Sequence, residues 1–258
     1  MAKALLQVRN LYKRFGGIIA VNGCSFEVLQ GQVVGLIGPN GAGKTTVFDI
    51  VSGRLAADGG RVVFRDQDVT HLPAHKIAAL GMSRTFQECR LFWDLSCLEN
   101  LLLAAQPKGL AVNLKSILSG GRLTSSADEE RARELLALVR LEKFASSPAK
   151  ALSFGQKRLL ELACALMTNP TILLLDEPAS GVNPTILEQI RELLSSLHAQ
   201  GLTLLVVEHN IQFISSLADT IVVLHYGQVL EVGPPEQIRN SSRVIEAYLG
   251  GRYASSGE

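Results

Sequence analysis

The sequence predicts an α/β fold that combines a mostly parallel β-sheet, an antiparallel β subdomain and an inserted α-helical subdomain. Apolar, strand-length runs alternate with amphipathic helical stretches over the last third of the chain, which is typical of parallel strands joined by right-handed crossovers. The first third has short strands separated by turns, and the middle has helical periodicity with little strand signal. Hydrophobic residues make up 47% of the chain and aromatic residues only 5%, which indicates an aliphatic core.

The first third is expected to contain an antiparallel layer and one strand of the parallel sheet. Residues 33–37 (Val-Val-Gly-Leu-Ile) are uniformly apolar, as a strand buried on both faces would be. A glycine-rich turn follows, and then a helix over residues 44–52 that Gly53 closes. The antiparallel strands are expected at residues 5–9, 25–29 and 61–65.

The middle and the end of the chain complete the predicted organisation. Helices are expected at residues 99–105 and 127–140, with a loop at 106–126 that carries a short helix around 114–118. The later elements are a helix at 156–167, a strand at 171–175, a helix at 184–199, strands at 202–207 and 220–224, a hairpin arm at 227–232 and one or two helices within 235–249. The predicted domains are a core of residues 1–87 and 151–250, a helical subdomain of residues 88–150 and a flexible tail of residues 251–258.

The clearest motif is the glycine-rich stretch between the predicted strand at 33–37 and the helix after it. It matches the pattern G-x-x-x-x-G-K-[ST], in which backbone N–H groups and a helix N-terminus bind phosphates. Lys44 would reach the β- and γ-phosphates of ATP, and Thr45 would place its hydroxyl on Mg²⁺. The motif therefore predicts a P-loop NTPase (RecA-like) core. Its residues are Gly38, Pro39, Asn40, Gly41, Ala42, Gly43, Lys44, Thr45 and Thr46.

A second motif, Asp176-Glu177, follows the apolar run at residues 171–175. The carboxyl ends of parallel strands form the ligand side of such a sheet, so both carboxylates are expected near the phosphates. Asp176 is assigned to the Mg²⁺ shell, and Glu177 is assigned as the base that polarises the attacking water. An acidic pair after a strand is more often a solvated turn, but the phosphate loop upstream favours the catalytic interpretation.

The third motif is Leu152-Ser153-Phe154-Gly155-Gln156, directly before a predicted helix. It resembles the signature motif of ABC transporter ATPases, usually Leu-Ser-Gly-Gly-Gln, with Phe154 at a glycine position. In that family the signature of one subunit closes over ATP bound to another subunit. The resemblance thus implies that Ser153, Gly155 and Gln156 contact the partner's nucleotide. A serine before a helix is also a common N-cap, which is the alternative interpretation.

Further positions match the same family. Gln87 matches the glutamine that touches Mg²⁺ and links the core to the helical insert, and His209 matches the switch histidine at the γ-phosphate. Phe15, rather than Tyr12, matches the aromatic residue that stacks on adenine. Asn183 stands where the family has aspartate, in a loop that crosses the dimer interface, and its amide could still donate or accept a hydrogen bond there.

The resemblance is closest to the larger of the two ATPase types in branched-chain amino-acid importers. It rests on Phe-Gly-Gly at residues 15–17, Arg-Thr-Phe-Gln at 84–87, the loop at 106–126 and the ending Ile-Glu-Ala-Tyr-Leu-Gly at 245–250. It implies an ATPase that uses ATP and Mg²⁺ at the cytoplasmic face of the inner membrane. The implied partners are integral membrane permease subunits, a second ABC ATPase subunit (the same or a different chain) in a head-to-tail dimer and, indirectly, a substrate-binding protein.

Composition limits the alternatives. The chain has 25 basic and 24 acidic side chains, which argues against a nucleic-acid partner. No secretory signal and no apolar stretch of membrane-spanning length is expected. Two other types of ABC ATPase stay open, namely a lipopolysaccharide-export type and a soluble type that serves iron–sulphur assembly. DNA-repair or chromosome types are disfavoured because no sustained heptads or zinc spacing occur between the phosphate loop and the signature. The scattered cysteines are expected to be buried thiols: Cys24, Cys89, Cys97 and Cys164.

Overall fold

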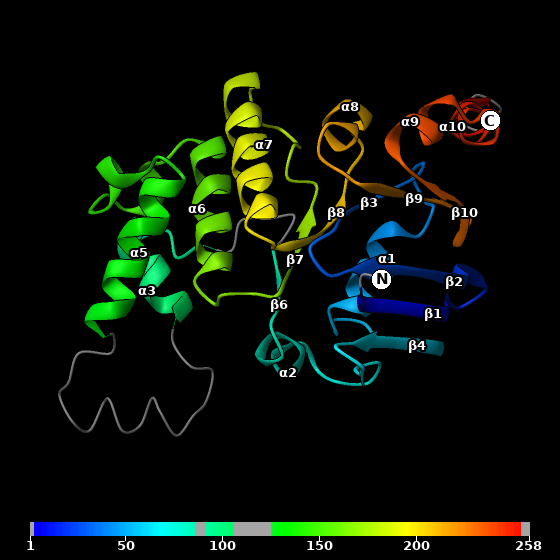
Figure 1. Cartoon of the computed structure of the whole chain (residues 1–258), viewed down its shortest axis with the longest axis horizontal. Helices are drawn as coiled ribbons and strands as arrows, with labels where there is room; N and C mark the ends of the chain where they lie inside the picture. The colour runs from blue at the N-terminus through cyan, green and yellow to red at the C-terminus, as the bar shows by residue number, and fades with distance from the viewer. Residues whose placement is uncertain (1–2, 86–90, 106–124, 254–258) are drawn as a thin grey trace.

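The computed structural model of the chain describes residues 3–85, 91–105 and 125–253 and contains two β-sheets and a group of helices (Figure 1). The larger sheet has six strands in the order β10-β9-β3-β8-β7-β6. Its strands pair in parallel from β9 to β6, whereas β10 is antiparallel to β9. These strands are β3 (Val33–Ile37), β6 (Met82–Arg84), β7 (Ile172–Asp176), β8 (Thr203–Val207), β9 (Thr220–His225) and β10 (Gln228–Gly233).

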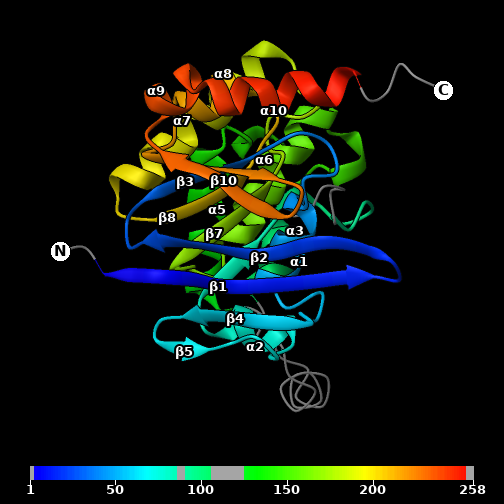
Figure 2. The ribbon, with the colours of Figure 1, turned by 90° about the vertical axis from the view of Figure 1, so that its right-hand side faces the viewer.

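The second sheet is antiparallel, with the order β2-β1-β4-β5 (Figure 2). Its first two strands form a hairpin much longer than the predicted strands at 5–9 and 25–29. Pairing in this hairpin continues through several register shifts, for example between Val8 and Leu11, so the period-2 pattern in the sequence is broken while the strand continues. The strands are β1 (Ala4–Phe15), β2 (Ile18–Leu29), β4 (Gly59–Phe64) and β5 (Gln67–Asp68).

Helices cover both faces of the six-stranded sheet. α1 lies between the two sheets, where it contacts β1, β2 and β8. α6 and α7 cover the opposite face, and α3 and α5 pack against α6 to extend the molecule on that side (Figure 1). The helices are α1 (Lys44–Val51), α2 (Ala74–Ala79), α3 (Cys97–Ala105), α5 (Ser126–Leu138), α6 (Phe154–Leu166), α7 (Pro184–Ala199), α8 (Ile211–Ser215), α9 (Pro235–Asn240) and α10 (Ser242–Tyr253), with the 3₁₀ turns η1 (Glu142–Phe144) and η2 (Ala149–Ala151).

Alternate residues of the central strands face two separate cores. In β3, Val34 and Leu36 pack with α1 and the antiparallel sheet, whereas Val33 and Ile37 pack on the α6 and α7 side. Successive side chains of a strand point to opposite faces, so a strand covered on both faces must be apolar throughout. This explains the uniformly apolar runs of β3, β7 and β8, and it confirms the predicted α/β class with its parallel sheet.

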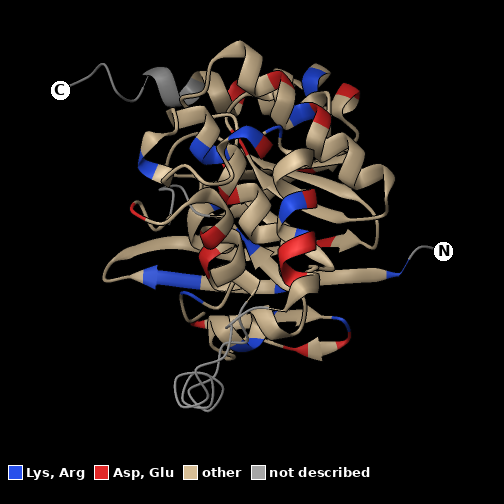
Figure 3. Ribbon diagram, turned by 90° about the vertical axis from the view of Figure 1, so that its left-hand side faces the viewer, with Lys and Arg blue, Asp and Glu red and all other residues tan. Residues whose placement is uncertain are grey.

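The remaining expectations have mixed outcomes. The predicted helix around residues 114–118 and most of the loop at 106–126 lie outside the described residues, as do Gln87 and Cys89. α10 extends to Tyr253, three residues into the segment expected to be a flexible tail. In the described segments, no helix is both long and apolar enough to cross a lipid bilayer. On the helical side of the molecule, basic and acidic residues are interspersed (Figure 3).

Candidate nucleotide-binding and catalytic site

The phosphate loop joins β3, near the centre of the large sheet, to the first turn of α1. Gly43, directly before α1, has a φ of 96°, in the left-handed region. A Cβ atom on Gly43 would lie closer than 3.0 Å to the carbonyl oxygen of Ala20 in β2, and one on Gly38 would overlap in the same way with the carbonyl oxygen of Leu224 in β9. The neighbouring strands therefore require glycine at both fixed glycine positions of the motif.

The loop is built to receive an anion. α1 begins without a side-chain cap, so its first N–H groups are left for a ligand. Lys44 is buried, and its Nζ donates to the carbonyl oxygens of Gly38 at 2.7 Å and Pro39 at 3.0 Å, which holds the ammonium across the loop. Burial lowers the pKa of Lys44, although the charge of Glu177 opposes this shift. Phosphate oxygens would provide the negative charge that this desolvated ammonium lacks.

A cavity of about 330 Å³ opens over the loop. Phe15, which is 49% exposed, lines it together with His209. Residues 40–46 of the phosphate loop also line it. The structure thus brings three of the sequence motifs to one cavity, although the outermost of them, Phe15 and His209, are 194 residues apart in the sequence.

The end of β1 positions Phe15. Asp58 accepts hydrogen bonds from Lys13 Nζ and from the backbone N–H of Arg14, both at 2.8 Å. Lys13 Nζ also lies 5.5 Å from the centroid of the Phe15 ring. These contacts fix the backbone directly before the aromatic residue.

Glu177 and His209 form a pair at the carboxyl end of the sheet. Oε1 of Glu177 and Nε2 of His209 are 2.6 Å apart. The Glu177 backbone has a φ of 49°, which is uncommon for a residue other than glycine, and its N–H donates to the carbonyl oxygen of Val207 at 2.9 Å. Such an arrangement can remove a proton from a water molecule while the imidazole holds the carboxylate in place.

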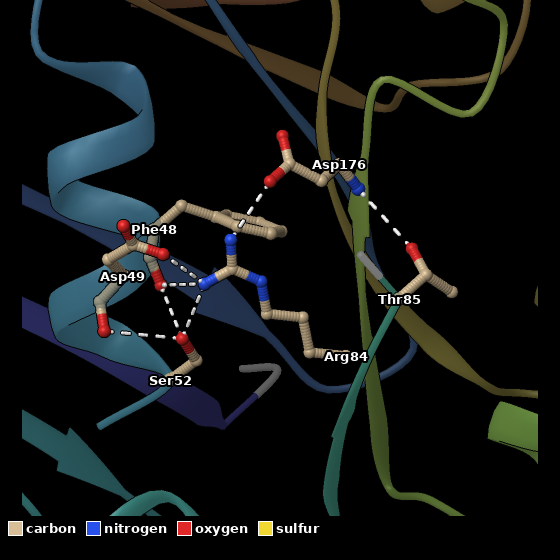
Figure 4. A network of polar contacts seen from close by, with 6 residues as sticks. All are labelled: Phe48, Asp49, Ser52, Arg84, Thr85 and Asp176. Atoms are coloured by element: carbon tan, nitrogen blue, oxygen red, sulfur yellow. Dashed lines mark hydrogen bonds and ion pairs between the residues drawn. The ribbon is translucent and has the colours of Figure 1, made fainter. Parts of the chain in front are cut away.

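Asp176, the last residue of β7, is buried beside Arg84 (Figure 4). Arg84 Nη2 donates to Asp176 Oδ2 at 2.9 Å, and Nη1 donates to Asp49 Oδ1 at 2.6 Å. Burial raises the pKa of Asp176, and Arg84 opposes this shift. The sequence analysis assigned no role to Arg84. The strand β6 that Arg84 ends was not predicted, so the sequence offered no signal that this guanidinium lies buried between two carboxylates.

Glu208, directly after β8, is a second residue that the sequence analysis missed. Its side chain is buried, and Oε1 accepts a hydrogen bond from the N–H of Ala179 at 2.7 Å. Oε2 accepts from the N–H groups of His209 at 2.9 Å and Asn210 at 3.1 Å. Burial raises the pKa of Glu208, and these three donors oppose the shift. The carboxylate therefore ties the loop after Glu177 to the loop that carries His209.

The signature residues are not among the described residues that line the cavity. Ser153 Oγ accepts from the N–H of Gln156 at 3.3 Å, and Gln156 Oε1 accepts from the N–H of Ser153 at 2.9 Å. The alternative interpretation of Ser153 as an N-cap of α6 thus describes its contacts within this chain. Gly155 packs against α7, because a Cβ there would lie 2.8 Å from Ile186 Cγ1. Phe154 is 51% exposed.

Asn183 has a comparable capping role at the start of α7. Its Oδ1 accepts a hydrogen bond from the N–H of Ile186 at 2.9 Å. Pro184 occupies the first helical position, where its fixed φ suits the helix and its missing N–H costs nothing. The amide oxygen is therefore engaged within the chain.

The donor set at the loop fits a magnesium ion that a nucleotide accompanies. Asp176 offers a carboxylate, and Thr45 offers an exposed hydroxyl in the first turn of α1. Proteins commonly hold Mg²⁺ through one or two carboxylates plus substrate phosphates. Among the residues that the structure describes, no group of three or more His, Cys, Asp or Glu side chains could hold a metal ion.

A mostly parallel sheet that presents a phosphate loop and acidic residues at the carboxyl ends of its strands is the architecture of P-loop nucleotide-binding proteins, and this chain is one of them. Residues 21–180 match the family model described as ABC transporter, and residues 228–254 match the model described as Branched-chain amino acid ATP-binding cassette transporter. The chain belongs to the ABC transporter family, as an ATP-binding cassette ATPase of the branched-chain amino acid group.

Individual relatives are similar over the whole chain. It is 43% identical to the high-affinity branched-chain amino acid transport ATP-binding protein BraF of Pseudomonas aeruginosa, over 97% of this chain and 99% of that protein. It is 42% identical to LivG of Escherichia coli (strain K12), over the same shares. The crystal structure of an ATP-binding cassette of an ABC transporter in its ADP conformation is 32% identical, with a TM-score of 0.85, over 96% of this chain and 99% of that chain. These comparisons confirm the predicted family and fold class.

Proposed function

We propose that this ATPase powers the import of branched-chain amino acids, or of related small solutes, through a membrane permease. The observation that carries the proposal is the 43% identity to BraF over 97% of the chain, and residues 228–254 also match the branched-chain model. BraF and LivG are both described as branched-chain amino acid transport ATP-binding proteins. The nature of the solute rests on this kinship, because the cavity over the phosphate loop suits a nucleotide.

The site residues are proposed to have the following roles. Phe15 stacks on the adenine, residues 38–46 bind the phosphates, and Lys44 neutralises the β- and γ-phosphates. Bound Mg²⁺ supplies charge neutralisation of the phosphates, and Thr45, Gln87 and Asp176 are the residues that would hold it. Glu177 accepts a proton from the attacking water.

His209 has two tasks in this proposal. Its pairing with Glu177 at 2.6 Å positions the carboxylate. When the γ-phosphate arrives, the imidazole can donate a hydrogen bond to it, since His209 lines the same cavity as the loop. The pair therefore changes its hydrogen bonding according to whether a γ-phosphate is present, which is the property a nucleotide switch requires.

The complete catalytic site is proposed to need two subunits. Ser153, Gly155 and Gln156 of one subunit would contact the nucleotide in the cavity of the other, in a head-to-tail dimer. A dimeric ATP-binding cassette bound to ADP and Pi is a structural relative, with a TM-score of 0.74 and 26% identity. The partner would be a second copy or a different ABC ATPase. Each copy of this chain in the dimer is proposed to consist of a core of residues 1–87 and 151–250 and a helical subdomain of residues 88–150.

The proposed location is the cytoplasmic face of the inner membrane, as a peripheral subunit bound to integral permease subunits. A substrate-binding protein would supply the solute from the other side. A lipopolysaccharide-export role is the second candidate, because the chain is 33% identical to LptB of Acidithiobacillus ferridurans over 96% of its length. The higher identity to BraF, 43%, favours amino-acid import.

Two variants and a purification test the proposal. Tagged Glu177→Gln protein is isolated from detergent-solubilised membranes with ATP, and the bound proteins are identified. The expected result is a multi-span permease and a stable ATP-bound ATPase dimer, whereas Lys44→Ala should lose ATP binding and the dimer. Solute uptake in cells that carry Glu177→Gln then tests the cargo, and leucine uptake should stop. Exclusively cytosolic partners would contradict the transport role.

A further inference from the structure

Arg84 joins three elements, β6, α1 and β7 (Figure 4). It ends β6, and its guanidinium lies between α1 and the carboxyl end of β7. Besides its two carboxylate partners, Asp49 and Asp176, Nη1 contacts Ser52 Oγ at 2.7 Å. The guanidinium also lies 4.5 Å from the centroid of the Phe48 ring. The guanidinium thus bridges α1 and β7 and lies over the ring of Phe48.

Because this cluster is largely buried, its charged groups must pair with one another in a fixed geometry. The side chains of Arg84 and Asp176 are only 7% and 4% exposed, and that of Asp49 is 30% exposed. A planar guanidinium can donate to two carboxylates in fixed directions, which the ammonium of lysine cannot do. Without this cation the buried carboxylate of Asp176 and the partly exposed carboxylate of Asp49 would repel each other, so Arg84 fixes both their distance and their orientation.

The cluster adjoins the residues proposed to hold Mg²⁺. Thr45, Asp49 and Ser52 are spaced i, i+4 and i+7, so they lie along one face of α1, with Thr45 at the phosphate end. Arg84 contacts the other two residues of this face and reaches Asp176 across the gap. It holds Oδ2 of Asp176, while the other carboxylate oxygen points away from Arg84 in Figure 4.

We infer that Arg84 is a positioning residue for Mg²⁺-nucleotide binding: it fixes the Asp176 carboxylate by one oxygen so that the other faces the metal. The inference rests on the proposed function, because it takes Asp176 as a residue of the Mg²⁺ site. Asp49 supports it indirectly by anchoring Arg84 to the helix that carries Thr45. Partners that hydrogen-bond to a metal-binding carboxylate typically change metal affinity by about 10–100-fold when they are removed.

The test measures metal affinity rather than turnover. Mn²⁺ is titrated into the protein–ADP complex, free Mn²⁺ is followed by electron paramagnetic resonance, and ADP affinity is measured separately in EDTA. Arg84→Gln should weaken Mn²⁺ binding about 10–100-fold. ADP affinity without metal should stay within about threefold, because the loop contacts of the phosphates are intact. The matched control is Arg133→Gln on α5, where an exposed arginine pairs with Glu129, and it should change neither value.

Three further variants separate a positioning role from a purely structural one. Arg84→Lys keeps the charge but loses the two-carboxylate geometry, so a partial loss of Mn²⁺ affinity is expected even if Arg84→Gln fails to fold. Asp49→Asn should give a smaller loss, and this loss should disappear in an Arg84→Lys background if Asp49 acts through Arg84. Asp176→Asn should weaken Mn²⁺ binding at least as much as Arg84→Gln.

The outcomes distinguish this inference from the proposal on which it rests. Unchanged or tighter Mn²⁺ binding in Arg84→Gln and Arg84→Lys, with weaker binding in Asp176→Asn, would overturn the role of Arg84 and leave the Mg²⁺ site intact. Unchanged binding in Asp176→Asn would overturn the Mg²⁺ site itself. Equal losses of ADP affinity with and without metal in Arg84→Gln would also overturn the inference, because they indicate a general loss of structure.

Discussion

The substitution Gly43→Ala tests whether contact with the neighbouring hairpin fixes the phosphate loop. An alanine at a φ of 96° adopts a left-handed conformation that costs about 1–2 kcal/mol. Its Cβ would also overlap with the backbone carbonyl oxygen of Ala20, which cannot rotate away. The loop or the hairpin must therefore move, and overpacking of this kind costs about 1–3 kcal/mol more.

The two effects together predict a loss of about 2–5 kcal/mol in the free energy of unfolding. Nucleotide affinity should fall by more than about tenfold, equivalent to about 1.4 kcal/mol, because the N–H donors of the first helical turn move with Gly43. Urea unfolding followed by far-UV circular dichroism measures the first quantity. Titration with a fluorescent ATP analogue measures the second.

Gly41→Ala is the matched control within the same loop. Gly41 has a φ of 79°, but a Cβ there would meet no atom within 4 Å. Its substitution should therefore cost only the conformational strain of about 1–2 kcal/mol. If both variants lost the same free energy of unfolding and bound the nucleotide equally, contact with Ala20 would not be what fixes the loop.

Three further substitutions test other contacts. Glu208→Gln should lower kcat about tenfold with little change in ATP affinity, because all three backbone donors lose a charged acceptor and the amide NH2 group cannot accept from at least one of them. An equal loss in a His209→Ala background would show that Glu208 does not act through His209. Asn183→Ala should lower the free energy of unfolding by about 1 kcal/mol through loss of the α7 N-cap, and Asn183→Asp should retain it. Lys13 and Arg14 lower the pKa of Asp58 below its ordinary value of 3.8. The stability advantage of the wild type over Asp58→Asn should thus be present above pH 3.8 and lost as the pH falls further, and an advantage independent of pH in urea unfolding would contradict this.

The elements that the sequence predicted well are those that neighbouring residues determine. α7 occupies residues 184–199 as predicted, because Asn183 and Pro184 define its start and its apolar residues follow the helical period. The phosphate loop could be predicted equally well, since its glycines, lysine and threonine lie within one short segment of the sequence. In contrast, β1 continues to Phe15 through register shifts that break the alternation of apolar residues, and a strand read from periodicity ends too early there.

Contacts between distant segments account for what the sequence did not reveal. Arg84 meets Asp176 and Asp49, which are 92 and 35 positions away. Glu208 meets Ala179, 29 positions away. Each of these charged residues, taken alone, is typical of a solvated surface, and their partners are defined only once the sheet order is known. The sequence could name the residues of the site motifs, but it could not show which polar groups hold them in place.

The strand order also constrains when the phosphate loop can form during synthesis. β3 is made early, but it pairs with β8 and β9, which end at Val207 and His225. At about 5–20 residues per second, a ribosome needs roughly 10–35 s to proceed from the loop to the end of β9. The antiparallel hairpin of β1 and β2 can form as soon as both strands are synthesised, because they are adjacent in the sequence. A nascent chain therefore carries the complete glycine-rich motif for many seconds before the nucleotide-binding site can form. A truncated product that ends before β9 would retain the motif but lack the sheet that positions it to bind a nucleotide.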